Sequence, residues 1–353
     1  MAMTTKREPM QFPIPKRRAP GLFAHKDASE FDFKFIKYQK NDGIARVTIN
    51  RPEAYNSYNL QALKEMTEAF DDVACDDRIG VTILRGEGDV AFCTGGDVKE
   101  YAEMIVQGKS QDMWHWMNWF VRAHDALRNT GKCSIACLNG IVVGGGNEWN
   151  LSCDVAIMAD TEWKEKPDGT KSPTRYIRQV GSTVGSVAAG GATQYLPLVV
   201  GMRRAKEILL FNRPIPPQQC KDWGLVNEVV PYAELDATVE KWAKDALNQF
   251  PGSIRSTREQ LNFFGNMVWG TSMGFAKDTL TRNMGGIESY FGMVGFAKKR
   301  PVDFDSIRRA AAEGADMELL FGPYVRTCPS CGLEGIPLEF DFCGKCGKKL
   351  EGE

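Results

Sequence analysis

Four stretches rich in β-branched and other apolar residues set the pattern of the first half of the chain, and each predicts a short strand. They are residues 44–50, 80–86, 133–140 and 153–159. Between the first two strands, apolar residues recur every three or four positions over residues 60–74, which predicts a helix. Strands that alternate with helices in this way predict an α/β chain with crossover connections.

The second half of the chain begins with a polar stretch and then becomes helical. Residues 162–178 are charged and contain proline and glycine, so we expect a surface loop or lid there. Residues 202–211 predict a helix, and residues 220–230 predict a helix that ends at Gly224 and is followed by a short strand. A helical pattern then continues to about residue 315.

Composition and charge narrow the class of protein. The 353 residues are 43% hydrophobic and carry a net charge of −1, which gives no electrostatic reason to bind nucleic acid or an anionic membrane. The chain contains no run of about 18 apolar residues, so we expect no membrane-spanning helix. The first 20 residues carry charge and proline without an apolar signal stretch. We therefore expect an irregular N-terminal arm and a cytoplasmic protein.

Two glycine clusters stand at expected strand–helix junctions, in "VAFCTGGDVKEY" (90–101) and "GIVVGGGNEW" (140–149). Glycine lets a ligand approach the backbone closely, and a helix N-terminus offers free N–H groups. Two facing junctions of this kind would form an oxyanion hole, in which each donor contributes about 3–4 kcal/mol to a transition state. Glu148 follows the second cluster by one helical turn. From these residues alone, a surface acid favoured by the helix dipole is the alternative to a catalytic group.

Several motifs in order resemble the crotonase (enoyl-CoA hydratase/isomerase) superfamily. They are "IARVTINRPEAYNSYN", "FCTGGD", "NGIVVGGGNE", "SCDVAIMAD" and "WGLVNEVV", within residues 38–305. The resemblance implies an α/β spiral of ββα turns that binds acyl-CoA and forms a homotrimer or a dimer of trimers. Together with the composition of the two ends, it divides the chain into an N-terminal arm (1–35), a spiral core (36–235), a C-terminal helical trimerisation region (236–320) and a cysteine-rich tail (325–353).

The resemblance also implies roles for individual residues. The thioester oxygen would lie between the backbone N–H groups of Gly96 and Gly145, and Glu148 falls where hydratases carry one of two catalytic glutamates. The carbonyl group of Thr94 would meet the adenine of coenzyme A. The neighbouring Gly95 and Gly144 belong to the same substrate-binding segments, and Arg51 is a candidate for the phosphates of coenzyme A.

One departure from the hydratase pattern directs the functional expectation. The chain has Gly181 where a hydratase carries its second glutamate. The segment "QVGSTVGS" is similar to 1,4-dihydroxy-2-naphthoyl-CoA synthases, but those carry an aspartate where this chain has Ala188. The length, the long segment after Asp160 and "NEWNLSCDVAIMADTEW" are most similar to the 6-oxocyclohex-1-ene-1-carbonyl-CoA hydrolases of anaerobic benzoyl-CoA degradation. The resemblance implies hydration and ring cleavage to 3-hydroxypimelyl-CoA; a hydratase or a naphthoyl-CoA synthase-like enzyme is the alternative.

The sequence does not single out a second proton-transfer group. Asp160 and, in the polar stretch that follows it, Glu162, Glu165 and Asp168 are candidates, and so is His115 in "WHWMNWF". His124 lies on the same expected helix. The aromatic residues of that helix form either a wall for a ring substrate or ordinary core or trimer packing.

The tail from about residue 325 contains two Cys-x2-Cys pairs separated by eleven residues, Cys328/Cys331 and Cys343/Cys346. Four thiolates at this spacing suit a tetrahedral Zn²⁺ ion with no open coordination position. We therefore predict a structural zinc ribbon, folded by its metal because so short a segment cannot bury a core. Disulfides are the alternative.

Overall fold

The computed structural model describes residues 25–107, 110–318, 326–334, 336–337 and 340–350. The chain opens into its main sheet with an antiparallel hairpin of β1 (Ile36–Asn41) and β2 (Ile44–Ile49). The two residues that join them, Asp42 and Gly43, both have positive φ angles, of 53° and 79°. An Asp-Gly pair favours this type of two-residue turn, which fixes the register of the hairpin.

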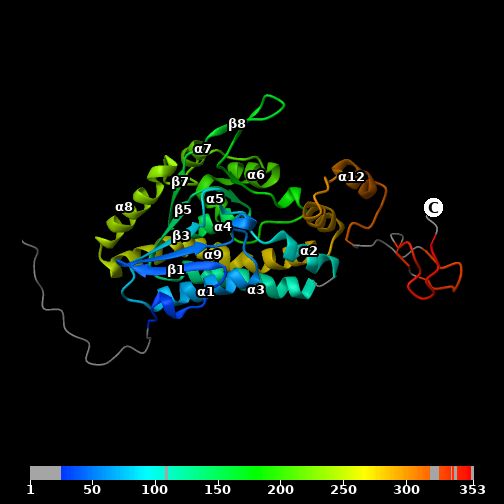
Figure 1. Ribbon diagram of the computed structural model, residues 1–353, viewed down its shortest axis with the longest axis horizontal. Coiled ribbons are helices and arrows are strands. Elements are labelled where there is room, and N and C mark those ends of the chain that lie inside the picture. The colour runs from blue at the N-terminus through cyan, green and yellow to red at the C-terminus, as the bar shows by residue number, and fades with distance from the viewer. Residues whose placement is uncertain (1–24, 108–109, 319–325, 335, 338–339, 351–353) are drawn as a thin grey trace, which may run out of the picture.

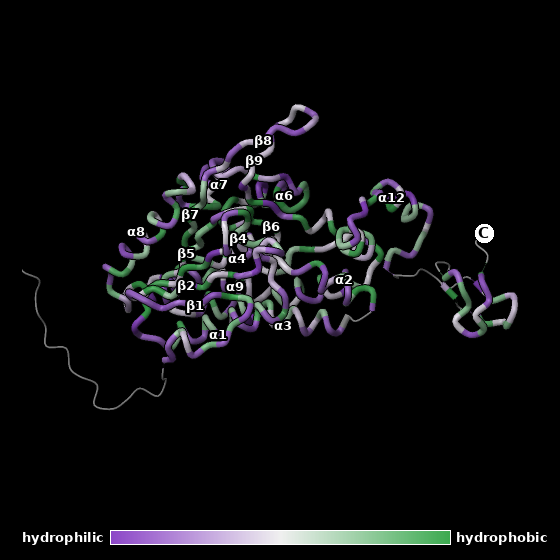
Figure 2. The backbone as a smooth tube through the Cα atoms, in the orientation of Figure 1, coloured by the Kyte–Doolittle hydropathy of each residue, from purple (hydrophilic) through white to green (hydrophobic). Residues whose placement is uncertain are grey.

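The main sheet has six strands in the order β1-β2-β3-β5-β7-β11, and every pair after the first hairpin is parallel. The added strands are β3 (Val81–Gly86), β5 (Cys133–Leu138), β7 (Val155–Ala159) and β11 (Glu228–Val230). Parallel strands covered on both faces are apolar throughout, which is why these segments read as continuous hydrophobic runs. Figure 2 shows this as hydrophobic colour along β5 and β7 in the interior.

A second, three-stranded sheet repeats the same progression in the order β10-β6-β4. Its strands are β4 (Ala91–Cys93), β6 (Ile141–Val143) and β10 (Ile177–Arg178). A strand of the main sheet is followed by a strand of the small sheet and then by a helix. In chain order, β3 and β4 are followed by α2 (Val98–Val106), and β5 and β6 are followed, in the same way, by α4 (Gly145–Ser152). This repeated ββα unit builds the expected spiral (Figure 1).

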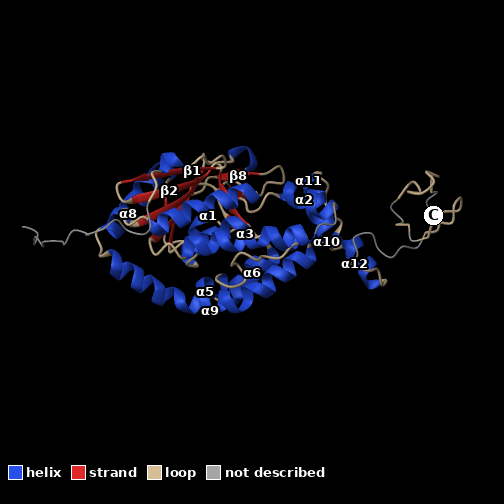
Figure 3. Ribbon diagram, turned by 90° about the horizontal axis from the view of Figure 1, so that it is seen from below, coloured by secondary structure: helices blue, strands red, loops and turns tan. Residues whose placement is uncertain are grey.

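Helices cover the main sheet on both faces (Figure 3). On one face, α1 (Leu60–Cys75) packs against the sheet and against α3 (Ser110–Arg128). The side chain of Asn59 caps α1 by accepting a hydrogen bond from the Ala62 N–H at 2.9 Å. On the other face, α8 (Leu235–Leu247) buries its apolar stripe against β3, β5 and β7.

The C-terminal region is dominated by the 33-residue helix α9 (Pro251–Asn283), which packs along α3. Its inner side buries Trp269, Met273 and Leu280. A set of apolar side chains on its other positions is exposed: Leu261, Phe263, Phe264, Met267 and Phe275. The remaining elements are α5 (Leu196–Val200), α6 (Met202–Phe211), α7 (Pro217–Asp222), α10 (Ile287–Ser289), a π-helical turn Tyr290–Val294, α11 (Gly295–Ala297), α12 (Phe304–Ala312) and 3-10 turns at Ala28–Glu30, Pro52–Ala54, Gly181–Thr183 and Tyr232–Glu234.

The four expected strands and the expected helices 60–74 and 202–211 agree with the structure to within two residues. The prediction of a surface segment at 162–178 is confirmed for residues 162–171, which are exposed, but the segment is not a plain loop, since β8 (Trp163–Glu165) and β9 (Lys171–Pro173) pair as a polar hairpin (Figure 2). Asp168 explains this, because its carboxylate accepts bonds from the Thr170 N–H and hydroxyl and closes a tight turn. Residues 1–24 of the expected arm and the boundary near residue 325 lie outside the described residues.

Candidate active site

A cavity with about 100 Å³ of free volume lies where β4 and β6 end and α2 and α4 begin. It brings together the residues that the sequence singled out at the two glycine clusters: Thr94, Gly95, Gly96, Gly144, Gly145 and Glu148. Apolar side chains of α3 and α9 and the backbone-rich segment 179–189 complete the wall. Polar side chains also reach the lining, namely Tyr58, Tyr101, Gln179 and Ser186.

The first glycine cluster is held by the backbone of Tyr58. The Tyr58 N–H donates to the Gly95 carbonyl at 2.9 Å, and the Tyr58 carbonyl accepts from the Asp97 N–H at 2.9 Å. Gly95 has a φ of 93°, and a Cβ there would lie 2.9 Å from the nitrogen of Gly145. Only glycine allows this backbone conformation together with so close an approach of the two clusters.

The second cluster needs three glycines for three different reasons. Gly144 has a φ of 54°. A Cβ on Gly145 would lie 1.8 Å from the hydroxyl oxygen of Tyr58, and a Cβ on Gly146 would lie 2.0 Å from the carbonyl oxygen of Cys93. The triplet therefore lets the start of α4 pack directly against β4 and beside a tyrosine.

The backbone N–H groups of Gly96 and Gly145 are free donors. Within the described ranges, neither N–H has a hydrogen-bond acceptor. Gly145 is the first residue of α4, so its N–H has no partner inside the helix and lies at the positive end of the helix dipole. Two free N–H groups on a shared cavity form a ready site for a carbonyl oxygen that gains negative charge.

Glu148 lines the same cavity at the end of the first turn of α4 and is only 4% exposed. One carboxylate oxygen accepts hydrogen bonds from the backbone N–H groups of Gly190, at 2.6 Å, and Ala192, at 3.3 Å. Burial raises the pKa of Glu148 to about 7, although the two N–H donors oppose this rise. A carboxyl group with such a pKa can both accept and return a proton near neutral pH.

Arg51 lies beside the site and is not part of the cavity wall. Its guanidinium donates to the Ser57 carbonyl at 2.6 Å and pairs with Asp97 at 2.7 Å. Asp97 also caps α2 by accepting from the Lys99 N–H at 3.0 Å. In this arrangement Arg51 and Asp97 position the segment that carries Gly96. The assignment of Arg51 to the phosphates of coenzyme A stays a prediction.

At the position expected for a second glutamate the cavity wall carries no carboxylate. Gly181 and Ala188 both line the cavity. Among the described lining residues, Glu148 is the only carboxylate. The candidates for a second proton-transfer group lie elsewhere: His115 borders a neighbouring pocket with Glu100, and Asp160 and Glu162 are exposed beyond β7.

His124 is also outside the cavity. It is fully buried in α3, with its ring stacked on Trp149 at 3.8 Å between centroids. Its Nδ1 lies 2.9 Å from the Phe120 carbonyl oxygen, and burial lowers the pKa of the ring to about 3. A neutral, stacked imidazole of this kind serves core packing.

Sequence reasoning missed three residues of the site: Tyr58, Tyr101 and Gly190. Tyr58 directly precedes the cap of α1, where a buried aromatic residue is typical of a hydrophobic staple. Gly190 is needed because a Cβ there would lie 2.4 Å from a carboxylate oxygen of Glu148 and 2.2 Å from the Phe120 ring. Tyr101 follows Val98 by three residues, so the two side chains share one face of α2, and both line the cavity.

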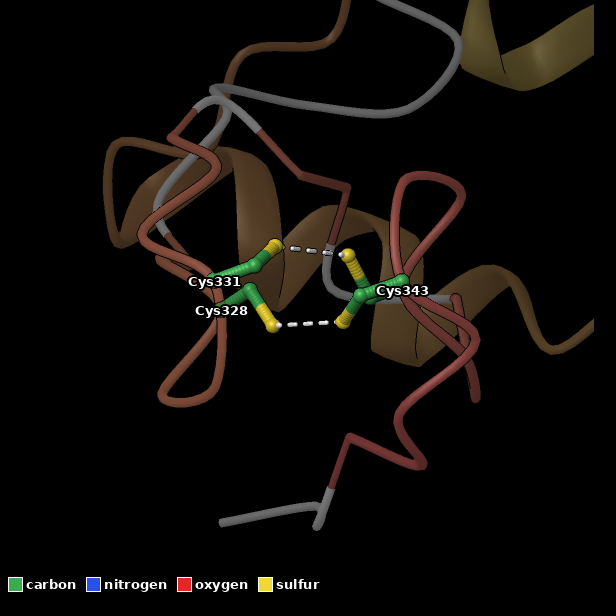
Figure 4. A group of neighbouring side chains, drawn as sticks. Cys328, Cys331 and Cys343 are labelled. Atoms are coloured by element: carbon green, nitrogen blue, oxygen red, sulfur yellow. Dashed lines mark hydrogen bonds between the residues drawn. The ribbon is translucent and has the colours of Figure 1, made fainter.

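The four tail cysteines form a separate cluster, with all four sulfurs within 4.8 Å of one another. Figure 4 shows the two pairs facing each other. The Sγ–Sγ distance is 3.6 Å both between Cys328 and Cys346 and between Cys331 and Cys343, so these are thiols and not disulfides. Each pair is followed by a glycine with positive φ, Gly332 at 70° and Gly347 at 69°.

Comparison with known proteins agrees with this geometry. The family described as "Enoyl-CoA hydratase/isomerase" matches residues 39–307. The chain belongs to the enoyl-CoA hydratase/isomerase family. Members of this family are enzymes that act on coenzyme A thioesters. The spiral of ββα turns and the C-terminal helical region are those of the family's crotonase fold.

Solved structures of the family share the fold at low sequence identity. An enoyl-CoA hydratase from Mycobacterium avium subsp. paratuberculosis is 21% identical with a TM-score of 0.65, and the match covers 77% of this chain and 99% of that one. An enoyl-CoA hydratase from Bacillus halodurans is 16% identical with a TM-score of 0.67, covering 74% and 100%. One from Bacillus anthracis is 25% identical with a TM-score of 0.59, covering 76% and 98%. Within the described residues, no helix combines the length and apolar character needed to cross a bilayer.

Proposed function

We propose that the protein is an acyl-CoA ring hydrolase that converts 6-oxocyclohex-1-ene-1-carbonyl-CoA to 3-hydroxypimelyl-CoA. One observation carries the proposal: a single buried carboxyl group, Glu148, shares a cavity with two free backbone N–H groups. Gly181 and Ala188 line the same cavity, and the other described lining residues include no further carboxylate. A hydratase with two glutamates would divide the proton transfers between them, whereas here one group must serve each step in turn.

Binding places the thioester oxygen on the N–H groups of Gly96 and Gly145. The thioester carbonyl is conjugated with the ring C=C bond, so donors on its oxygen draw electrons away from the β carbon. The backbone carbonyl group of Thr94, which directly precedes Gly95, would accept a hydrogen bond from the adenine amino group. Arg51 is the candidate cation for the phosphates, in addition to its pairing with Asp97.

In the first step, Glu148 accepts a proton from water as the water oxygen bonds to the β carbon. The electron pair of the C=C bond moves into the thioester enolate, which the two N–H groups stabilise. Glu148 then returns the proton to the α carbon. The neutral and ionised forms of Glu148 are both accessible near pH 7 because burial brings its pKa to about 7.

In the second step, Glu148 activates another water, whose oxygen bonds to the ring ketone carbon. The tetrahedral alkoxide collapses to a carboxylic acid as the bond between the ketone carbon and the α carbon breaks. The electron pair of that bond becomes the same thioester enolate, and Glu148 again protonates the α carbon. One oxyanion hole and one carboxyl group therefore serve both steps.

The test is mass spectrometry of the products formed from 6-oxocyclohex-1-ene-1-carbonyl-CoA. A gain of two waters supports hydration followed by ring opening. A gain of one water supports the second candidate, an enoyl-CoA hydratase, which the family match favours. An unchanged substrate would refute both for this thioester. A naphthoyl-CoA synthase-like reaction would instead give a cyclised product from an open-chain aromatic thioester.

The tail is proposed to hold a structural Zn²⁺ ion on Cys328, Cys331, Cys343 and Cys346. Tetrahedral zinc with Zn–S bonds of about 2.3 Å places its sulfurs about 3.8 Å apart, and the observed pairs are at 3.6 Å. Four protein ligands leave no position for substrate, so the ion would stabilise the ribbon and take no part in the reaction.

A homotrimer or a dimer of trimers is proposed as the assembly. The exposed apolar side chains of α9 support it, since Leu261 is 76%, Phe264 61% and Phe275 76% exposed in the single chain. Several large exposed apolar side chains on one helix are typical of a protein–protein interface.

A further inference from the structure

Two tyrosine hydroxyl groups lie directly over the two glycines of the oxyanion hole. The hydroxyl oxygen of Tyr101 is 1.8 Å from the position that a Cβ would take on Gly96. The hydroxyl oxygen of Tyr58 has the same 1.8 Å relation to Gly145. Both tyrosines line the cavity that holds Glu148. The site therefore has two O–H groups beside its two N–H groups.

Neither hydroxyl group forms a hydrogen bond within the described part of the protein. Among the residues that the structure describes, no hydrogen bond connects the hydroxyl of Tyr58 or Tyr101 to any other group. Tyr58 is only 1% exposed, and Tyr101 is half-buried. A polar group on a cavity wall that has no partner in the protein is available to a bound ligand.

The rings are held rigidly, so the hydroxyl groups are preorganised. Tyr58 stacks near Trp116 and Phe120, with centroids 6.2 Å and 5.8 Å apart and planes within 24°. Tyr101 meets the Trp116 ring edge to face at 4.9 Å. Trp116 is itself fixed, because its indole N–H donates to Glu100 at 2.8 Å. Little reorganisation is needed before these donors act.

Both phenols are neutral at physiological pH. Burial raises the pKa of each well above its usual value, and the nearby Glu148 carboxylate raises both further. They therefore act as hydrogen-bond donors and not as bases. Donors suit a carbonyl oxygen or an alkoxide, and they complement Glu148, which supplies the base.

We propose that Tyr58 and Tyr101 bind a second oxygen of the acyl group, carried on the carbon β to the thioester carbonyl carbon, and so select β-oxo acyl thioesters. In such a thioester the two carbonyl oxygens lie side by side when they point the same way, and here the two hydroxyl oxygens lie beside the two glycines that carry the N–H groups. The inference rests on the proposed function, because the ring ketone of the proposed substrate stands in this relation to its thioester.

The two hydroxyl groups would then assist the second step. Their hydrogen bonds polarise the ring ketone for attack by water and stabilise the alkoxide that follows. No proton leaves either tyrosine. The proton of the attacking water goes to Glu148, and the electron pair of the broken C–C bond goes to the thioester enolate on the backbone N–H groups.

The test compares two thioesters of equal carbon number, acetoacetyl-CoA with a β-oxo group and butyryl-CoA without one. Isothermal titration calorimetry is performed on the full chain, on Tyr58→Phe and Tyr101→Phe, and on the control Tyr232→Phe. The Tyr232 hydroxyl lies on the surface near the Gly88 carbonyl, at 3.5 Å, and outside the cavity. Each cavity variant loses one oxygen that has no partner, and Tyr232→Phe loses one long surface hydrogen bond, so we expect unchanged folding in all three, checked by melting temperature.

The natural chain should bind acetoacetyl-CoA at least tenfold more tightly than butyryl-CoA, the scale of one or two neutral hydrogen bonds. Each cavity variant should lose about tenfold of this preference and keep its affinity for butyryl-CoA, while Tyr232→Phe keeps both. A preference that is absent, or that survives in both cavity variants, overturns the inference.

The outcomes separate this inference from the proposed ring hydrolysis. If the natural chain fails to open the cyclic substrate but shows the tyrosine-dependent preference, the ring-hydrolase proposal falls and the β-oxo site stands. If ring opening occurs with the same kcat/KM in the cavity variants as in the natural chain, the β-oxo site falls and the hydrolase proposal stands.

Discussion

Replacing Glu148 by glutamine should make the protein more stable and much less active. Burial raises the pKa of the Glu148 carboxyl group to about 7 in the folded chain, against a usual value of 4.5. Below about pH 4.5 the carboxyl group is protonated in both the folded and the unfolded chain, and its contribution to the free energy of unfolding is fully present. As the pH rises from 4.5 to 7 that contribution is lost, because the unfolded chain ionises first and the folded chain must then bury a charge.

The size of this effect follows from the interval between the two values. At 1.36 kcal/mol per pH unit, ionisation of the buried group costs about 3 kcal/mol above pH 7. Glutamine is nearly isosteric and stays neutral, and its carbonyl oxygen can accept the same bonds from Gly190 and Ala192. Glu148→Gln should therefore exceed the natural chain in stability by up to about 3 kcal/mol at pH 8 and differ little from it at pH 4.5.

Turnover should move in the opposite direction. Loss of a general base lowers the rate by about 10²–10⁴-fold, while affinity for coenzyme A thioesters should be kept because the backbone donors remain. In the natural chain the base form of Glu148 is required, so kcat/KM should rise with pH to a plateau above about 7. The rising limb should be absent from the residual activity of the variant.

Denaturant unfolding at pH 4.5, 6, 7 and 8 and a pH–rate profile test both parts. Glu65→Gln is the matched control, since Glu65 is 3% exposed and accepts the Phe35 N–H at 2.8 Å outside the cavity. This control should leave the pH–rate profile unchanged. A stability difference for Glu148→Gln that does not vary with pH, or a variant with unchanged turnover, would refute the reasoning.

Three further predictions concern other parts of the chain. Gly190→Ala should lower the free energy of unfolding by about 1–3 kcal/mol in thermal unfolding, since its Cβ would lie 2.2 Å from the Phe120 ring. The control Gly270→Ala on α9 places a Cβ with no atom within 4 Å and should not destabilise the chain. Equal effects of the two substitutions would contradict the packing argument. Leu261→Asp combined with Phe264→Asp should dissociate the proposed trimer to monomers in light scattering, and an unchanged mass would show that this face of α9 is not the interface. Chelation should release one zinc ion per chain and expose four thiols to a thiol reagent without loss of ring opening; a chain purified without zinc, or one inactivated by chelation, would contradict a structural site.

The sequence predicted the elements of the spiral because their patterns are local. The strands at 44–50 and 153–159 and the helix at 60–74 are set by the spacing of their own apolar residues. The β8–β9 hairpin was not predicted, because its residues are polar and its turn depends on the side chain of Asp168. Charge and proline content did not distinguish a two-stranded hairpin from an irregular loop.

The candidate site divides in the same way. The glycine clusters and Glu148 stand next to one another in sequence, so their meeting at one cavity followed from the strand–helix junctions. Tyr58 and Gly190 lie far from them in the chain, and only the spiral brings the three segments together. Nothing in the sequence around position 190 indicates that the backbone N–H groups of Gly190 and Ala192 donate hydrogen bonds to the carboxyl group of Glu148.

The proposed oxyanion donors belong to the backbone, and this has an evolutionary consequence. No substitution removes an N–H group of Gly96 or Gly145, other than one to proline, although a Cβ on either glycine would lie 1.8 Å from a tyrosine hydroxyl oxygen. Sensitivity to mutation therefore extends to the positions that keep this backbone in place. A Cβ would meet backbone atoms at 2.2 Å on Gly86 and at 2.4 Å on Gly140, where the ββ units pack together. In a scan of all single substitutions these glycines would tolerate almost nothing. The side chains that face the acyl group carry no such constraint, so a lineage can exchange its substrate while it inherits the thioester chemistry unchanged.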